Sequence, residues 1–274
     1  MPTHTPLKDI IVNMLYLGPM EKAHIIENGC KQNSATPQGV YKALRLLRDR
    51  EIIASHQKTV SLSLAWIEKE AHRLKTAEET YKARAHAQFL LKLRDGEHRT
   101  FRFRTLLDLH LFWVQAFFIL ESQIPPSVPT YAFAPHDWFY DLAPGSDEAW
   151  ARRLRKSDRF QGATITHATA FDRRVIRERK VDKVEFVFNK NPLGLTYQQH
   201  LNLIGPWIIM AKLDKKVARL IDIFAQKHEK PSPATGEELS AILNTRGSHT
   251  LKITRSQKRA DKIVRAVKNY FTFR

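Results

Sequence analysis

Polar side chains able to read the edges of nucleic-acid bases recur in the segment 36–50. They are Gln38, Tyr41, Lys42 and Arg45. Gln and Arg can each make paired hydrogen bonds, Gln with the edge of adenine and Arg with the edge of guanine. Most polar helix faces are only solvated surface. The geometry of these two side chains and the length of the preceding polar turn, 31–35, favour contact with DNA.

The segment that carries these side chains reads as a helix. Thr36 can cap its start, and Pro37 suits the first turn because its missing N–H would be unpaired there. A separate apolar face has helical spacing and should point inward; it comprises Val40, Leu44 and Leu47. The helix should therefore present its polar side to solvent.

A short hairpin should follow this helix. Ile52 and Ile53 begin a β-like run, 55–58 is polar enough to turn, and apolar and polar residues alternate over 60–64. Two further helices are predicted before it, over 6–17 and 20–29. This order is typical of a winged helix-turn-helix domain, expected over 1–66.

The residues expected to contact DNA lie on the helix and at the hairpin tip. They are Thr36, Gln38, Gly39, Tyr41, Lys42, Arg45, His56, Gln57 and Lys58. His56 could contact phosphate, although an exposed histidine in a turn is often incidental. Cys30 is interpreted as a small packed residue rather than a reactive thiol.

The run TPQGVYKALRLLRDREII, followed by a strand and Trp66, resembles the winged-helix domains of TrmB-like transcription regulators. The resemblance covers about a quarter of the chain and implies that the helix opened by this run reads DNA. Regulators of this group carry effector domains related to the phospholipase D fold, and residues 249–271 are similar to it in a general way. The catalytic His-x-Lys…Asp motif of that fold is incomplete here, because His228 and Lys230 are followed by Thr235 where the Asp should stand.

The rest of the chain is expected to form a connector, 67–97, and a mixed α/β domain, 98–274, so the fold class is α+β. A helix over 66–93 carries an apolar stripe that could pair in a homodimer or pack on its own C-terminal domain. Residues 106–120 should be a buried helix. Alternating strands and helices indicate a largely parallel sheet, with 230–236 as an exposed linker.

Within the C-terminal domain, His136, Asp137 and Trp138 follow a predicted strand and could line a pocket for a small-molecule effector. The alternative interpretation makes Trp138 and its aromatic neighbours core residues around a turn. There is no glycine-rich phosphate loop, no Gly-x-Ser-x-Gly motif and no closely spaced cluster of metal ligands. The sequence therefore predicts no cofactor, no metal and no enzymatic activity.

Composition limits the class of protein. No apolar run approaches the roughly 20 residues needed to cross a bilayer, no secretory signal is evident, and the single cysteine excludes an internal disulfide. We therefore expect a cytoplasmic protein with no membrane partner. The net charge of +17 points to a polyanionic partner.

The charge is unevenly distributed. Residues 1–70 are nearly neutral, and 105–149 contain acidic but no basic side chains. The excess of Lys and Arg lies in the connecting segment 71–104 and, within the C-terminal half, in 150–180 and 246–274. The basic segment 150–180 could contact phosphate or pair with the acidic stretch 105–149.

These observations favour a sequence-specific regulator that binds double-stranded DNA as a homodimer. One alternative is a nucleic-acid-binding protein of replication, defence or RNA metabolism. A second is a divergent phosphodiesterase or nuclease.

Overall fold

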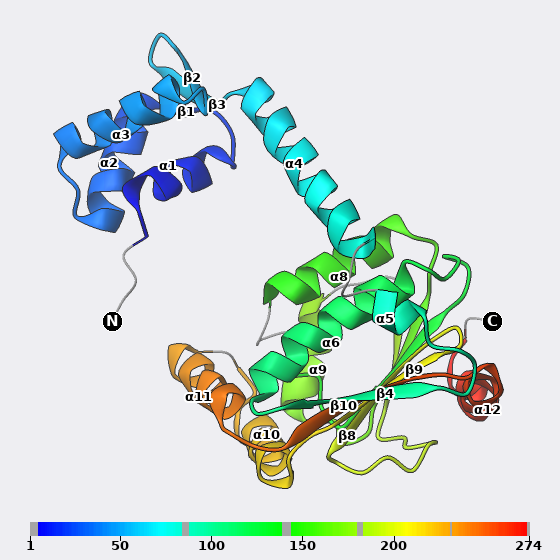
Figure 1. Cartoon of the computed structure of the whole chain (residues 1–274). Helices are drawn as coiled ribbons and strands as arrows, with labels where there is room; N and C mark the ends of the chain where they lie inside the picture. The colour runs from blue at the N-terminus through cyan, green and yellow to red at the C-terminus, as the bar shows by residue number, and fades with distance from the viewer. Residues whose placement is uncertain (1–4, 84–87, 139–143, 180–182, 231, 273–274) are drawn as a thin grey trace. The chain divides into compact units, whose positions relative to one another are not determined.

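The computed structural model describes residues 5–83, 88–138, 144–179, 183–230 and 232–272. The chain is of the α+β class and divides into two compact units, Met1–Ala83 and Arg84–Arg274 (Figure 1). The boundaries at 66 and 97 expected from the sequence stay a prediction. Among the described residues, no helix combines the length and the apolar character needed to cross a membrane.

The N-terminal unit packs three helices against a small antiparallel sheet. Its elements are α1 (Leu7–Leu15), β1 (Met20–Glu21), α2 (Lys22–Asn33), α3 (Pro37–Asp49), β2 (Ile53–His56) and β3 (Thr59–Leu62). The strand order is β1-β3-β2, so β1 adds a third strand to the expected hairpin. The core joins Ile11 of α1 and Ile25 of α2 to Val40 and Leu44 of α3, as the apolar spacing in α3 predicts.

Helix α4 (Leu64–Ala83) follows the hairpin and carries exposed apolar side chains. Ile67, Leu74 and Tyr81 recur at intervals of seven residues, and they are 39%, 67% and 64% exposed. The sequence predicts one helix as far as Leu93. The structure describes α4 as far as Ala83 and a short helix α5 (Gln88–Leu91). Residues 84–87 lie outside the described part of the chain, so a single helix as far as Leu93 stays a prediction.

The C-terminal unit is built on a seven-stranded sheet of order β4-β10-β9-β8-β5-β6-β7. The strands are β4 (His98–Phe103), β5 (Thr130–Ala134), β6 (Gln161–Ile165), β7 (Val184–Phe188), β8 (Gln199–Ile204), β9 (Trp207–Lys212) and β10 (His249–Arg255). Among the strand pairs that the structure describes, β5–β6 and β6–β7 are the parallel ones. The other pairs are antiparallel, so the prediction of a largely parallel sheet is wrong.

Helices cover both faces of this sheet. They are α6 (Leu106–Glu121), α8 (Pro144–Lys156), α9 (Ala170–Arg179), α10 (Lys215–Lys227), α11 (Pro233–Asn244) and α12 (Gln257–Val267), which is followed by the 3-10 turn η1 (Lys268–Tyr270). Because strand side chains alternate, Ile209 packs in the core of α6, α10 and α11, whereas Ile208 packs with Ala260 of α12. The helix predicted over 106–120 is buried as expected.

The prediction of an exposed linker over 230–236 is also wrong, because α11 begins at Pro233. Ser232 caps this helix: its hydroxyl accepts a hydrogen bond from the backbone N–H of Thr235. The Thr235 hydroxyl in turn accepts from the backbone N–H of Ser232, which completes a reciprocal cap. Residues that resemble a turn in sequence therefore begin a helix.

Candidate functional site: an exposed helix face and a buried histidine cluster

Helix α3 is fixed by its first turn and by its inner face. The Thr36 hydroxyl accepts a hydrogen bond from the Gly39 N–H at 3.1 Å, and Pro37 occupies the first turn. Val40 and Leu47 are buried against the other two helices of the unit. The predicted DNA-contact residues Thr36 and Gly39 thus lie at the start of α3, where the Thr36 side chain serves as the cap.

The outer face of α3 is polar and solvent-exposed, as predicted. It comprises Gln38, Tyr41, Lys42 and Arg45, which recur at helical spacings of three and four residues. Tyr41 is 50% exposed. In the part of the chain that the structure describes, neither Lys42 nor Arg45 makes an ion pair, whereas Arg48 pairs with Asp49 at 3.3 Å. The cationic groups of Lys42 and Arg45 are therefore available to an external anion.

The tip of the β2–β3 hairpin is exposed as well. His56 pairs with Thr59 across the hairpin, and Gln57 and Lys58 form the two-residue turn. Gln57 has a backbone φ of 52°, in the left-handed region that favours glycine. The three predicted hairpin contacts, His56, Gln57 and Lys58, all point into solvent.

In the C-terminal unit, the predicted ligand-binding residues follow strand β5 and are buried. His136, Asp137 and Trp138 are 2%, 8% and 0% exposed. The Trp138 indole N–H donates to His200 Nε2 at 3.2 Å, and Trp138 belongs to the main hydrophobic core, which agrees with the alternative interpretation of this segment. Phe139 and Tyr140 lie outside the described residues.

His136 lies between two carboxylates. Its Nδ1 is 3.0 Å from Asp172 Oδ2, and its Nε2 is 3.0 Å from Asp222 Oδ1. Burial lowers the pKa of His136, but the hydrogen bonds and negative charges of the two aspartates outweigh burial and raise the pKa above its ordinary value. A cation at this ring, or a second proton on it, is therefore stabilised.

Asp172 is fully buried and is held by three further donors. Its Oδ1 accepts the backbone N–H of Asp137 at 2.8 Å, and its Oδ2 accepts the backbone N–H and the hydroxyl of Thr169, both at 2.9 Å. Burial raises the pKa of Asp172, but the hydrogen bond and charge of His136 and the backbone donors outweigh it, so the pKa is lowered. Asp172 is thus a fixed anion that orients the His136 ring.

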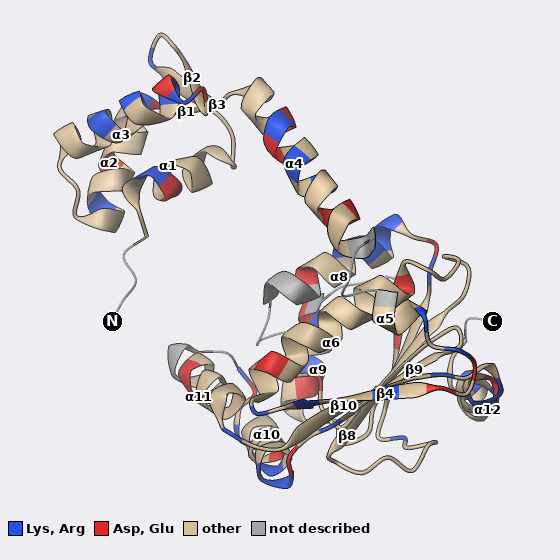
Figure 2. Ribbon diagram, in the orientation of Figure 1, with Lys and Arg blue, Asp and Glu red and all other residues tan. Residues whose placement is uncertain are grey.

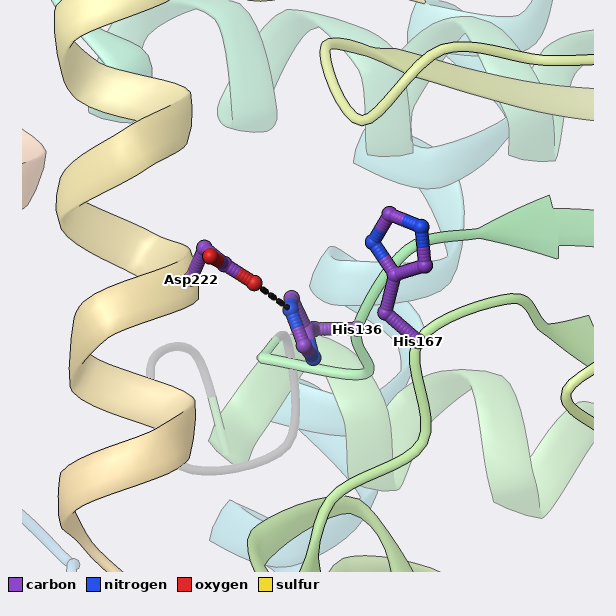
Figure 3. Close-up of side chains that lie close together, drawn as sticks. All are labelled: His136, His167 and Asp222. Carbon is purple, nitrogen blue, oxygen red and sulfur yellow. Dashed lines mark hydrogen bonds and ion pairs between the residues drawn. The ribbon is translucent and has the colours of Figure 1, made fainter.

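His167 completes the cluster (Figure 3). Its ring centroid is 6.1 Å from that of His136, and one donor atom each of His136, His167 and Asp222 lie within 4.8 Å of one another. His136 and His167 each come two residues after a strand, and β5 and β6 are parallel neighbours, so both histidines lie at the same edge of the sheet. Asp222 comes from α10.

Sequence reasoning missed His167, Asp172 and Asp222. His136 and Asp222 are 86 positions apart, so no local motif links them, and the sequence predicts no metal-ligand cluster for that reason. The one available signal was that His136 follows one predicted strand and His167 ends the next, predicted over 162–167. That signal depends on the two strands being adjacent and parallel, which the sequence does not establish.

A largely apolar cavity of about 140 Å³ lies between α6, α8 and the strands β5, β6, β7 and β8. The aromatic residues that line it are Trp113, Phe117, Phe118, Phe133, Trp150 and Phe186. Its few polar lining groups include Asp137, and burial lowers the pKa of His110 to about 4 and that of His200 to about 3. Both histidines are therefore neutral near pH 7. The Thr164 hydroxyl, buried on the same wall, has no hydrogen-bond partner among the described residues.

The basic segment 150–180 pairs in part with the acidic stretch 105–149. Arg153 and Arg159 both approach Glu121 of α6, at 3.0 and 3.4 Å, and Arg152 lies 3.8 Å from Glu148. Arg159 is 3% exposed and also donates to the backbone carbonyls of Val128 and Ile124. Figure 2 shows α6 itself without Lys or Arg. Part of the positive charge of 150–180 is therefore used in ion pairs within the unit.

No known protein family matches this chain, and no curated protein matches it either.

Proposed function

We propose that the chain is a sequence-specific, double-stranded-DNA-binding transcription regulator whose N-terminal unit acts as a winged helix. The observation that carries the proposal is the outer face of α3, where Gln38, Lys42 and Arg45 are exposed above a packed inner face. An α-helix fits the major groove of B-DNA, and Gln and Arg suit base edges there. The exposed hairpin tip would contact the DNA backbone or the minor groove.

Exposed cations outside the helix would supply phosphate contacts. Lys58 stands at the hairpin tip, and Figure 2 shows further Lys and Arg along α4 and on α12. Phosphate neutralisation releases counterions, so we expect affinity to fall steeply as the salt concentration rises. This part of the binding carries no sequence information.

We propose that α4 pairs with its copy in a homodimer. The exposed recurrence of Ile67, Leu74 and Tyr81 at intervals of seven supports this, because such a stripe forms the seam of a coiled coil. A two-fold dimer would bind a palindromic site with half-sites about one turn of DNA apart. Sedimentation of the full chain would test pairing: Leu74→Glu should yield monomers, and a wild-type protein that is already monomeric at high concentration would refute it.

The C-terminal unit would sense a small effector or add contacts to phosphate. The apolar cavity beside α6 is the place where a small effector would bind, since its lining is mostly aromatic and its few polar groups could orient a ligand. The phospholipase-D-like arrangement stays a hypothesis.

The decisive experiment is selection of bound duplexes from a random library by the full chain, followed by affinity measurements on the selected and scrambled duplexes. Gln38→Ala and Arg45→Ala should each reduce the discrimination between the two by about 1–3 kcal/mol. Lys75→Ala, which removes an exposed charge from α4, is the control and should retain discrimination.

If wild-type protein enriches no duplex sequence, the regulator proposal fails. Tighter binding to single strands or to structured RNA at equal salt would favour the alternative of a nucleic-acid-binding protein without sequence-specific regulatory activity. If both α3 variants discriminate as well as wild type does, α3 is not the reading helix.

A further inference from the structure

Both ring nitrogens of His136 face carboxylate oxygens, but a neutral imidazole carries only one proton to share between them. Each nitrogen lies 3.0 Å from its carboxylate oxygen. The buried Asp172 takes the Nδ1 proton, because its other bonds hold its oxygens in place. The lone pair on Nε2 then faces Asp222, another acceptor. Two acceptors at this distance repel each other unless the ring carries a second proton or one cation binds both atoms.

We propose that His136, His167 and Asp222 bind one divalent transition-metal ion of the zinc class. Two imidazole nitrogens and one carboxylate oxygen form a donor set that suits Zn²⁺ and neighbouring transition metals, whereas Mg²⁺ and Ca²⁺ prefer oxygen donors. The three side chains come from the loop after β5, the loop after β6 and helix α10; Asp222 and His136 point toward each other, and His167 lies beside them (Figure 3).

The surroundings of the cluster match those of a metal site. Asp172 bonds to the ring nitrogen of His136 that faces away from Asp222, and an outer carboxylate in that position fixes the tautomer of a metal-binding histidine. The second oxygen of Asp222 accepts from the Gln226 amide at 3.1 Å, which restrains the carboxylate.

Exposure of the donors shows how an ion would enter. His136 is buried, the Asp222 side chain is 34% exposed and His167 is exposed. The two accessible side chains can close on an ion held by His136, which would shorten the present spread of 4.8 Å among the donor atoms. Three protein donors leave a coordination position for water or a ligand, as in catalytic rather than structural zinc sites.

The rival interpretation is a doubly protonated His136 that makes two ion pairs. It explains the same distances without a metal, but it gives His167 no role. The two interpretations therefore differ in what a change at His167 does to metal binding. His167 is exposed, so its replacement should leave the fold intact.

The experiment uses the full chain, stripped of metal with a chelator and dialysed. Zn²⁺ binding is measured by calorimetry and Co²⁺ binding by its visible absorption, which reports the coordination geometry. The wild type should bind one equivalent, and His167→Ala should weaken binding at least tenfold. His72→Ala, which removes an exposed histidine from α4, is the matched control and should bind as wild type does.

A second pair of variants tests the cluster independently. Asp222→Asn should also weaken binding at least tenfold, and Asp172→Asn, which alters only the outer carboxylate, should weaken it about 10–100-fold. Circular dichroism at equal temperature checks that each variant is folded. Weak binding of several equivalents that His167→Ala and His72→Ala reduce alike would show only adventitious surface histidines and would overturn the proposal, as would the absence of binding.

The metal site lies in the C-terminal unit and does not depend on the DNA-reading role of α3. Metal binding with no DNA binding would leave this inference standing and remove the proposed function. The reverse result would do the opposite.

Discussion

The two polar groupings of this molecule are stabilised in opposite ways. The α3 face consists of exposed side chains that share one helix, and Lys42 and Arg45 make no ion pair within the described residues. The His136 cluster draws side chains from separate elements, and Asp172 at its base is fully buried with every oxygen hydrogen-bonded. The face can change without disturbing the fold, whereas the cluster is part of the fold.

Among changes that compare the buried cluster with the exposed face, the largest loss of stability is expected at Asp172. Asp172→Asn turns one acceptor into a donor that faces either the Asp137 N–H or the His136 ring. Removing one partner of a buried charged pair costs about 3–5 kcal/mol of unfolding free energy. Urea unfolding in the presence of a chelator measures it. Lys42→Ala, on the exposed face, should change stability by less than about 0.5 kcal/mol, and equal losses in the two variants would contradict the contrast.

The second-largest predicted effect is on the pH dependence of the unfolding free energy, and it comes from His110. The folded pKa is about 4 because of burial, while the unfolded pKa is near 6.5, so the unfolded chain binds more protons between these values. Stability is therefore full above pH 6.5 and falls as pH drops towards 4, by about 3 kcal/mol from this group. His110→Gln should remove that component from denaturation curves recorded across the range. Parallel pH profiles for the variant and the wild type would show that His110 is not buried as described.

The helix start offers a smaller effect. Thr36→Ala removes the oxygen that caps α3, and such a loss costs about 1 kcal/mol. Thr36→Ser keeps the oxygen and serves as the control in thermal unfolding of the full chain. If the two variants unfold alike, Thr36 does not cap the helix in solution, and it becomes available to DNA.

The smallest predicted effect is a gain in stability. Gln57 has a φ of 52° at the hairpin tip, where a side chain costs about 1–2 kcal/mol, so Gln57→Gly should stabilise the N-terminal unit by up to about that much, less the entropic cost of fixing glycine. Lys58→Gly, at the neighbouring turn position without a positive φ, should be neutral or destabilising. If Lys58→Gly raised stability and Gln57→Gly lowered it, the positive φ would lie at Lys58 rather than at Gln57.

The sequence predicts those parts of the molecule whose signals are local. Val40, Leu44 and Leu47 share a helical period within a single segment, so the orientation of α3 follows from it. The polar residues of the hairpin and the apolar run of α6 are equally local signals.

The sequence does not predict features that depend on the neighbours of each strand. Strand β8 contains the polar residues Gln199 and Asn202, which weaken the apolar pattern expected of a buried strand. The residues that begin α11 read as a turn until the cap at Ser232 is known. The sheet is mostly antiparallel because β8, β9 and β10 join it by antiparallel pairing after β5 to β7, an arrangement that no periodicity encodes. The His136 cluster depends on the parallel pairing of β5 with β6, which the sequence does not establish either.

The sheet of the C-terminal unit also has a consequence for synthesis of the chain. Among the described strands of the unit, β4 comes first along the chain, yet it pairs with β10, the last of them to be made. A growing polypeptide must therefore carry β4 unpaired until nearly the whole unit has been translated. Pairings so distant along the chain are slow to form, so exposure of this edge to chaperones and to other nascent chains should peak late in translation.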